Sequence, residues 1–264
     1  DEAVALTDFT NVTSVEVLTA VDGVQITGNL GAAADAAGIR TLTLNDTGNG
    51  DNVTIDAEFT SALTVNLDDG NNTVDASAYT GVLTVATTET IVDDDVHTLT
   101  GGTGTADELL VTADGTGIDN ASMASITAFE KITIANNLAT GTIALDELNI
   151  ADGATLTVDA TAITTATNAF TLDASDDTNG NLVVLGGAGV NTITGSASDL
   201  GDNITGGGSN DIFQFEATDL TTLDTVAGGE GSDSIRYTAD EAVALTDFTN
   251  VTSVEVLTAV DGVQ

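Results

Sequence analysis

Short stretches in which apolar residues alternate with Thr or Asn recur along the chain from Thr41 onward. Alternation of this kind predicts β-strands that bury one face and expose the other. The stretches follow one another at intervals of 9 to 12 residues, with turn-forming residues between them. The first five have their apolar positions at Leu42/Leu44, Val53/Ile55, Leu63/Val65/Leu67, Val74 and Leu83/Val85.

A longer period of about 21 residues relates every second stretch to the one before it. The period is present in the pairs Leu42 and Leu63, Val53 and Val74, and Val65 and Val85. It is typical of a solenoid in which two strands and two turns form one coil. Because each strand is too short to bury itself, stacked coils must supply both the core and the backbone hydrogen bonds. We therefore predict an all-β fold, a parallel β-solenoid (β-helix or β-roll) with two short strands per coil.

Gly, Asn and Asp fill the segments between the predicted strands, as at 45–52 and 176–180. These residues tolerate positive φ or bind their own backbone, so they favour turns. Signals for helices are few along the chain. Residues 30–37, ahead of Gly38, and residues 144–150 are the two candidate helices.

Two internal repeats indicate a tandem organisation. Residues 240–264 repeat residues 1–25 without a change, at an offset of 239 residues, and residues 228–240 resemble 101–114 at an offset of about 127. We interpret the chain as slightly more than one period of a tandem array, with an engineered duplication as the alternative. The predicted units are a first solenoid half at 1–100, which starts inside a repeat, a second half at 101–239, and the start of the next repeat at 240–264.

The composition narrows the class of protein and its partners. The chain carries 42 acidic residues against three basic ones, and 41% of its residues are hydrophobic, which argues against disorder. A formal charge of -39 repels itself, so we expect folding to depend on counter-ions. We also expect this charge to exclude nucleic acid as a partner. No run of apolar residues is long enough to predict membrane insertion. The acidic, cysteine-free composition is compatible with export, and we expect a secreted protein at the cell surface.

Segment 228–236 matches the nine-residue pattern G-G-x-G-x-D-x-U-x at every fixed position. On this segment the chain resembles the RTX calcium-binding repeat proteins, and its Thr- and Asp-rich coils resemble bacterial surface-layer and giant adhesin repeats. The resemblance implies calcium ions (Ca2+) between stacked turns, with Gly229, Gly231 and Asp233 in the turn at 228–236. Calcium takes roughly six to eight oxygen ligands, so at least two neighbouring turns must contribute.

Four other segments match the pattern less closely. One has Asn at the ligand position, one lacks a glycine, one retains only its second half, and one contains an inserted residue. Their candidate ligand and corner residues are Asn191 with Gly187 and Gly189, Asp211 with Gly207, Asp202, and Asp107. These departures indicate a few calcium sites rather than a regular row, and ordinary solenoid turns are the alternative interpretation of all of them.

We expect a non-catalytic structural repeat of a secreted, calcium-stabilised bacterial fibre, surface layer or adhesin stalk, joined head to tail with copies of itself. One alternative is a recognition module whose outward Thr and Asn rows bind a glycan or ice. A second is a salt-adapted archaeal surface protein in which general ionic strength replaces calcium. A third is a polysaccharide-active enzyme, although basic and aromatic residues for sugar binding are few. His97, the only histidine, is interpreted as a turn or strand residue rather than a catalytic base.

Overall fold

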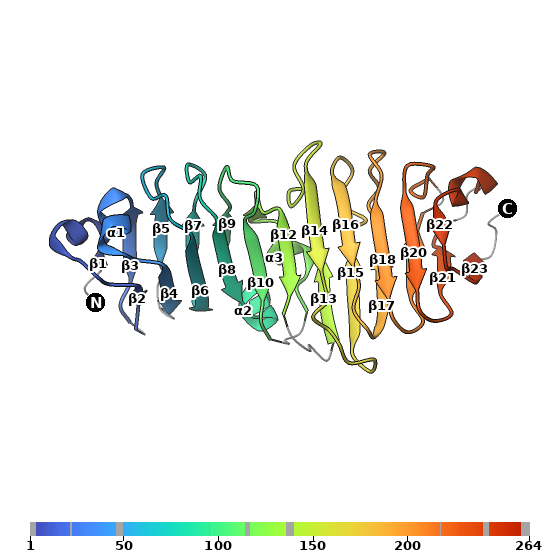
Figure 1. Cartoon of the computed structure of the whole chain (residues 1–264), viewed down its shortest axis with the longest axis horizontal. Helices are drawn as coiled ribbons and strands as arrows, with labels where there is room; N and C mark the ends of the chain where they lie inside the picture. Colours follow the sequence, from blue (N-terminus) through green and yellow to red (C-terminus); the bar gives the residue numbers. More distant parts are fainter. Residues whose placement is uncertain are drawn as a thin grey trace.

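The chain forms an elongated parallel β-solenoid whose two ends lie at opposite ends of the rod (Figure 1). This computed structural model describes residues 4–21, 23–45, 50–94, 96–113, 117–135, 140–216, 218–239 and 243–259. The strands pair in parallel along the whole rod, which confirms the predicted fold class. Parts of the duplicated segments 1–25 and 240–264, and Asp95 and Asp114, lie outside the described residues.

Three sheets build the solenoid. Sheet B runs from end to end and contains eleven strands: β2 (Val17–Thr19), β4 (Thr41–Asn45), β6 (Leu63–Asp69), β8 (Leu83–Thr87), β10 (Glu108–Val111), β12 (Lys131–Ile134), β14 (Thr155–Asp159), β16 (Asn181–Leu185), β18 (Asn203–Gly207), β20 (Thr225–Gly229) and β22 (Val251–Thr252). Sheet A, in the first half, contains β1 (Val4–Ala5), β3 (Ile26–Leu30), β5 (Asn52–Ile55), β7 (Thr73–Asp75), β9 (Thr98–Thr100) and β11 (Ile126–Thr127). Sheet C, in the second half, contains β13 (Thr140–Ala144), β15 (Ala169–Asp173), β17 (Val190–Thr194), β19 (Ile212–Phe215), β21 (Ser234–Tyr237) and β23 (Val256–Ala259).

Each coil combines one strand of sheet B with one strand of sheet A or sheet C. The predicted pairings of Val53 with Val74 and of Val65 with Val85 are confirmed. Leu42 pairs with Val65 rather than with Leu63, so that prediction was wrong by two residues. A shift of two keeps the same face of a strand inward, so the burial pattern survives the change of register.

The core is mainly aliphatic, with some buried aromatic side chains, and lies between sheet B and the two shorter sheets. Alternate residues of the strands point inward, as the sequence pattern predicts, and Leu42, Val65, Val53 and Ile193 are fully buried. Burial of apolar surface contributes roughly 25 cal/mol per Å², and stacked coils extend it continuously along the rod.

Short helices interrupt some turns. In the described part of the chain, three are α-helices, α1 (Ala32–Ala37), α2 (Glu89–Asp94) and α3 (Asn120–Met123), and two are 3-10 helices, η1 (Leu6–Asn11) and η2 (Leu245–Phe248). Helix α1 confirms the candidate at 30–37 and ends at Gly38, which is left-handed. The candidate at 144–150 was wrong, because Ala144 and Leu145 donate their N–H groups to neighbouring coils instead. No helix in the described ranges is long and apolar enough to cross a membrane.

Three segments share one local structure, and we call them joints: residues 4–20, 118–134 and 243–259. Each contains a short helix, namely η1, α3 or η2. A residue with positive φ follows it in each case, at Ser14 (58°), Ala128 (59°) and Ser253 (52°). The first and third joints are identical in sequence, and the second is their diverged relative.

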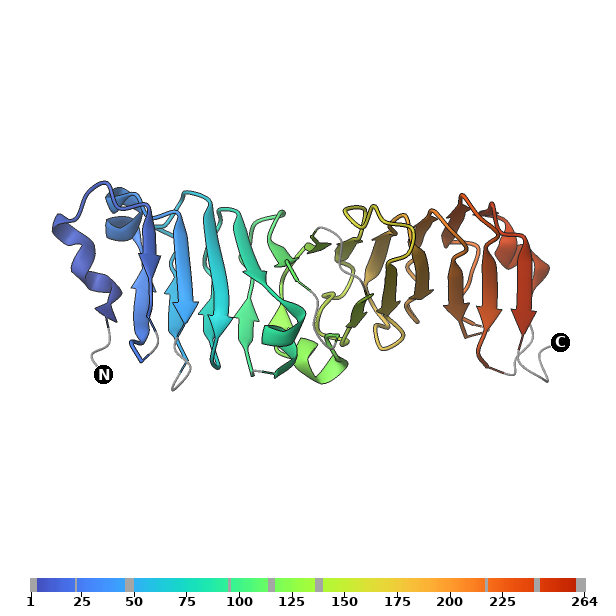
Figure 2. The same ribbon diagram turned by 90° about the horizontal axis from the view of Figure 1, so that it is seen from below.

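The second joint is where one sheet ends and another begins. Strand β11 is the last strand of sheet A, and Ile118 pairs with Ile143 of β13, the first strand of sheet C. The green part of the chain interrupts the regular stacking near the middle of the rod (Figure 2). In the third joint, β22 is the last strand of sheet B while β23 continues sheet C. The second joint therefore carries the solenoid from sheet A to sheet C.

Candidate functional site

A stack of four polar residues lies where the chain passes from sheet B to sheet C, and we call it the corner ladder: Asn191, Asp211, Asp233 and Glu255. Each acidic side chain accepts a backbone N–H from the preceding coil. The donor–acceptor distances are 2.7 Å from Asn191 N to Asp211 Oδ1, 2.7 Å from Asp211 N to Asp233 Oδ1, and 2.8 Å from Asp233 N to Glu255 Oε2. The first three residues are each only 1% exposed. The corner ladder therefore provides hydrogen-bond acceptors for backbone N–H groups that are buried in the corner.

Glycines make room for these carboxylates. A Cβ on Gly206 would lie 2.2 Å from Asp211 Oδ2, and a Cβ on Gly228 would lie 2.4 Å from Asp233 Oδ2. Both distances are far below van der Waals contact. In these two segments the first glycine is therefore required so that the acid can turn inward.

The glycines predicted from the motif line the same corner. Gly207 and Gly229 both have φ of 107°, and Gly231 has φ of 143°, in the region that favours glycine. A Cβ on Gly187 or Gly189 would lie 2.8 or 1.6 Å from the nearest atom of the coil before. The structure gives all five glycines a role in shaping the corner.

Asn191 and Asp211 differ in the group that they present to the next coil. The Asn191 side-chain Nδ2 donates to Gly189 O and Gly206 O, both at 2.8 Å. On the following coil, Asp211 Oδ2 and Gly228 O lie 2.2 and 2.5 Å from the point that a Cβ of Gly206 would occupy. Asn191 therefore places an N–H donor beside the carbonyl group of the next coil, whereas Asp211 places a carboxylate oxygen there, which can only accept.

Asp233 repeats this arrangement one coil later. Its Oδ2 and the carbonyl oxygen of Ser253 lie 2.4 and 1.8 Å from the position of a Cβ on Gly228. Asp211 Oδ2 and Asp233 Oδ2 are both buried without a hydrogen-bond partner in the described part of the chain. A buried carboxylate oxygen among carbonyl oxygens is costly unless a proton or a cation lies between them.

The pKa of Asp211 reflects this environment. Burial raises it to about 6, and the neighbouring charge of Asp233 adds to the increase, against the hydrogen bonds that Asn191 donates. Burial therefore favours the protonated form of the Asp211 carboxyl, and a cation beside it would favour the ionised form.

Asp202 lies in a different corner, where the chain returns from sheet C to sheet B. Its two oxygens accept hydrogen bonds from Ser196 N and Ser196 Oγ, both at 2.8 Å. Its own N–H donates to Asp224 Oδ1 at 2.6 Å. Burial raises the pKa of Asp202 to about 7, despite the hydrogen bonds from Ser196.

Asp107 lies in the first half, where the chain passes from sheet A to sheet B. Its Oδ1 accepts from Leu83 N at 2.8 Å and its Oδ2 from Gly102 N at 2.7 Å. Its N–H donates to Glu130 Oε2 at 2.8 Å, as the N–H of Asp233 does to Glu255. Both carboxylate oxygens of Asp107 are thus occupied by backbone donors.

Sequence reasoning missed several residues of these ladders. Glu130 and Glu255 occupy equivalent places in the diverged repeat, so alignment of the two copies was the signal that could have found them. Asn72 donates its N–H to His97 Nδ1 at 3.2 Å, and His97 Nε2 lies 2.9 Å from Ile91 O. His97 is buried and lies directly before β9.

Side chains alone do not build a metal site at any of these corners. Within the described residues, no group of three or more His, Asp or Glu side chains is arranged to hold a metal ion. A cation at the corner ladder would therefore use Asp211, Asp233, backbone carbonyl groups and water. That oxygen set is the kind that calcium prefers.

Comparison with protein-family models, with curated proteins and with solved structures finds no match to this chain in any of the three.

Proposed function

We propose that this chain is a structural repeat of a secreted bacterial surface protein, such as a fibre, a surface layer or an adhesin stalk. The observation that carries the proposal is that identical joints lie at opposite ends of one continuous solenoid. A solenoid coil contacts only its neighbours along the axis, so added copies extend the rod without changing its cross-section. Extension along one axis is what a fibre or stalk requires.

Calcium stabilises the second half in this proposal. Asp211 and Asp233 each keep one buried oxygen without a hydrogen-bond donor, beside carbonyl groups of the next coil. Bound calcium would neutralise these oxygens and reduce the repulsion within a chain of charge -39. Because the ion is abundant outside cells, its binding would couple completion of the fold to export.

Thermal unfolding followed by circular dichroism tests this role of calcium. We expect the melting temperature at neutral pH to rise with calcium over its value in EDTA, and to rise less with magnesium or potassium at equal ionic strength. An equal response to molar potassium chloride would instead support general salt adaptation. An unchanged melting temperature and spectrum on chelation would refute the calcium proposal.

The alternative of surface recognition has one supporting feature. Thr41, Thr64 and Thr84 lie side by side on successive strands, at outward positions of sheet B. The row then continues through Glu108 and Lys131, which break the threonine pattern. A second threonine row, Thr142, Thr171 and Thr192 of sheet C, also covers three coils and ends at Ile212, so we favour the structural role.

A further inference from the structure

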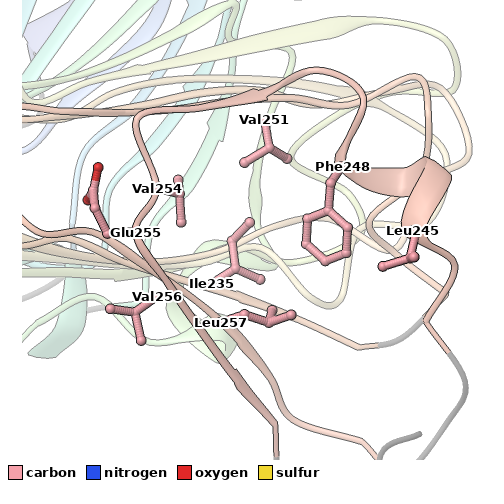
Figure 3. A pocket seen from close by; sticks show the side chains of 8 residues that line it. All are labelled: Ile235, Leu245, Phe248, Val251, Val254, Glu255, Val256 and Leu257. Carbon is pink, nitrogen blue, oxygen red and sulfur yellow. The ribbon is translucent and has the colours of Figure 1, made fainter.

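The C-terminal end of the rod presents an uncovered apolar groove. Figure 3 shows Ile235, Leu245, Phe248 and Leu257 around a common space, which belongs to the third joint and its neighbour β21. Leu245 is 88% exposed and Leu257 is 58% exposed. Large apolar side chains gathered at an open strand edge mark an interaction surface.

The first joint, which has the same sequence, is covered on the corresponding side. Strand β4 pairs with β2 so that Leu42 lies beside Leu18, the counterpart of Leu257. Strand β3 pairs with β1, and helix α1 contacts η1. Ala20 is only 2% exposed there, whereas its counterpart Ala259 is exposed.

Backbone hydrogen bonds also join the first joint to the coil that follows it. Val15 N donates to Ala37 O at 3.0 Å, and Ala20 N donates to Thr43 O at 2.9 Å. In the opposite direction, Arg40 N donates to Glu16 O at 2.9 Å. The edge formed by β3, α1 and β4, which we call the acceptor edge (residues 26–45), therefore matches a joint in both apolar contacts and hydrogen bonds.

The second joint is covered in the same manner. Strand β14 pairs with β12, and Ile118 pairs with Ile143 of β13. Two of the three joints thus carry a following coil, and the third has the same sequence as the first. At the C-terminal end, the same joint sequence has no following coil against it among the described residues.

We propose that residues 243–259 bind the acceptor edge of a second copy of this chain, taking the place of that copy's own residues 4–20. The acceptor edge meets the same side chains in either case, because the two joints are identical. Every interaction that breaks within one molecule is replaced by its equivalent between molecules, as in the exchange of identical elements between protomers. This proposal rests on the structural role proposed above and names the surfaces that would join the copies.

The exchange predicts specific pairs across the new interface. Val256 would lie beside Thr41 of the second copy, and Leu257 beside Leu42, as Val17 and Leu18 do within one molecule. Simple stacking of the intact ends would instead place residues 243–259 against the outer side of residues 4–20. The two modes of association can therefore be distinguished by which residue meets Val256.

Disulfide trapping tests this pairing, because the natural sequence has no cysteine. The variant would carry Val256→Cys and Thr41→Cys, positions at opposite ends of the rod, so a bond between them must join two molecules (Figure 1). Val256 is 44% exposed and accessible to oxidation. We expect head-to-tail ladders on gels, with the 41–256 disulfide identified by mass spectrometry. The matched control combines Val256→Cys with Thr84→Cys, an outward residue of sheet B whose neighbouring strands, β6 and β10, stay in place in the exchange.

A second test makes the same Leu→Asp substitution in either the third or the first joint, as two separate variants. Leu257→Asp should reduce 41–256 crosslinking to the level of the control, since it places a charge against Leu42 of the second copy. Leu18→Asp weakens the competing joint within the molecule, so crosslinking should increase, by roughly tenfold for a cost near 1.4 kcal/mol. A 41–256 yield no greater than the control yield, or the same direction of change for both substitutions, would overturn the exchange.

The same samples separate this proposal from the role of calcium. Thermal melts with calcium and with EDTA report on the corner ladder, whereas the disulfide reports on the interface between the ends. Calcium-dependent melting without the 41–256 bond would reject only the exchange. The 41–256 bond without calcium-dependent melting would reject only the calcium proposal.

Discussion

The backbone N–H of Asp211 donates to the carboxylate of Asp233 across 2.7 Å, so the acid of one coil closes the corner of the coil before it. The second carboxylate oxygen of Asp233 has no such donor and lies beside Ser253 O. One residue therefore combines a structural hydrogen bond with an unneutralised buried oxygen. The hydrogen bond ties two successive coils together, and the second oxygen is the position at which a cation would neutralise the buried charge.

Replacing Asp211 and Asp233 with Asn should remove the dependence on calcium. The amide would keep the oxygen that accepts the backbone N–H and would present a donor to the carbonyl groups, as Asn191 does. We expect the double variant to melt in EDTA at or above the temperature of the natural chain, with little further increase in calcium. Asp152→Asn, at an exposed turn, is the matched control and should keep the natural response.

Stability in the presence of a chelator should fall between mildly acidic and neutral pH. The folded pKa values of Asp211 (about 6) and Asp202 (about 7) exceed the unfolded value near 4, so the folded state binds more protons in this window. Their contribution is complete below pH ~4 and is lost as the pH rises through the folded values, on the order of 3 kcal/mol for Asp211. Chemical denaturation at several pH values measures this slope.

The variant Asp202→Asn, Asp211→Asn should flatten that slope. A free energy of unfolding that instead rises from pH 4.5 to pH 7.5 in EDTA would contradict the assignment. Below this window the sign is opposite for Asp35, because hydrogen bonds from Ser61 and Thr60 and the charge of Arg40 outweigh burial and hold its pKa at about 2. The comparison is therefore confined to pH values above about 4.

Gly228→Ala should destabilise the last coils of the rod. The added Cβ would lie 1.8 Å from Ser253 O and 2.4 Å from Asp233 Oδ2, so the backbone or the acid must move. We expect a loss of about 2–4 kcal/mol in denaturant unfolding. At Gly31 the nearest atom to a Cβ is 3.5 Å away, so Gly31→Ala is the control and should cost less than about 1 kcal/mol.

Asp107→Ala should destabilise the first half independently of calcium. It leaves the N–H groups of Leu83 and Gly102 without their acceptor, at a cost of about 1–3 kcal/mol. Because both of its oxygens already accept backbone donors, the loss should be equal with calcium and with EDTA. A loss seen only in calcium would show instead that Asp107 acts through the metal.

The fold was largely predictable from the sequence, because alternation within strands and the spacing of turns are both local signals. Val53 and Val74 pair as the period required. Helices α2 and α3 were missed, since they depend on single contacts such as the Asp119 carboxylate that accepts Ser122 N at 2.8 Å. The change from sheet A to sheet C was also missed, because it results from how a joint meets both neighbouring coils.

The sequence identified Asn191, Asp211 and Asp233 of the corner ladder, but neither Glu255 nor the geometry of the corner. The nine-residue pattern located Asp211 and Asp233 in one corner and also included Asp107 and Asp202, which lie in other corners with both oxygens occupied. Which carboxylate oxygen lacks a donor depends on the carbonyl groups of the next coil. This property depends on contacts between coils, so a sequence motif within one coil cannot predict it.

The two identical joints lie on different faces of the rod. Val17 belongs to β2 in sheet B, whereas its counterpart Val256 belongs to β23 in sheet C. Strand β23 comes 21 strands after β2 at two strands per coil, so the sequence recurs after ten and a half coils. Copies joined by superposing their joints would therefore place sheet B of one copy in line with sheet C of the copy before it. Any loop or ligand site on the surface would then alternate between opposite sides of the fibre, and the repeating unit along the fibre would be two copies of the chain.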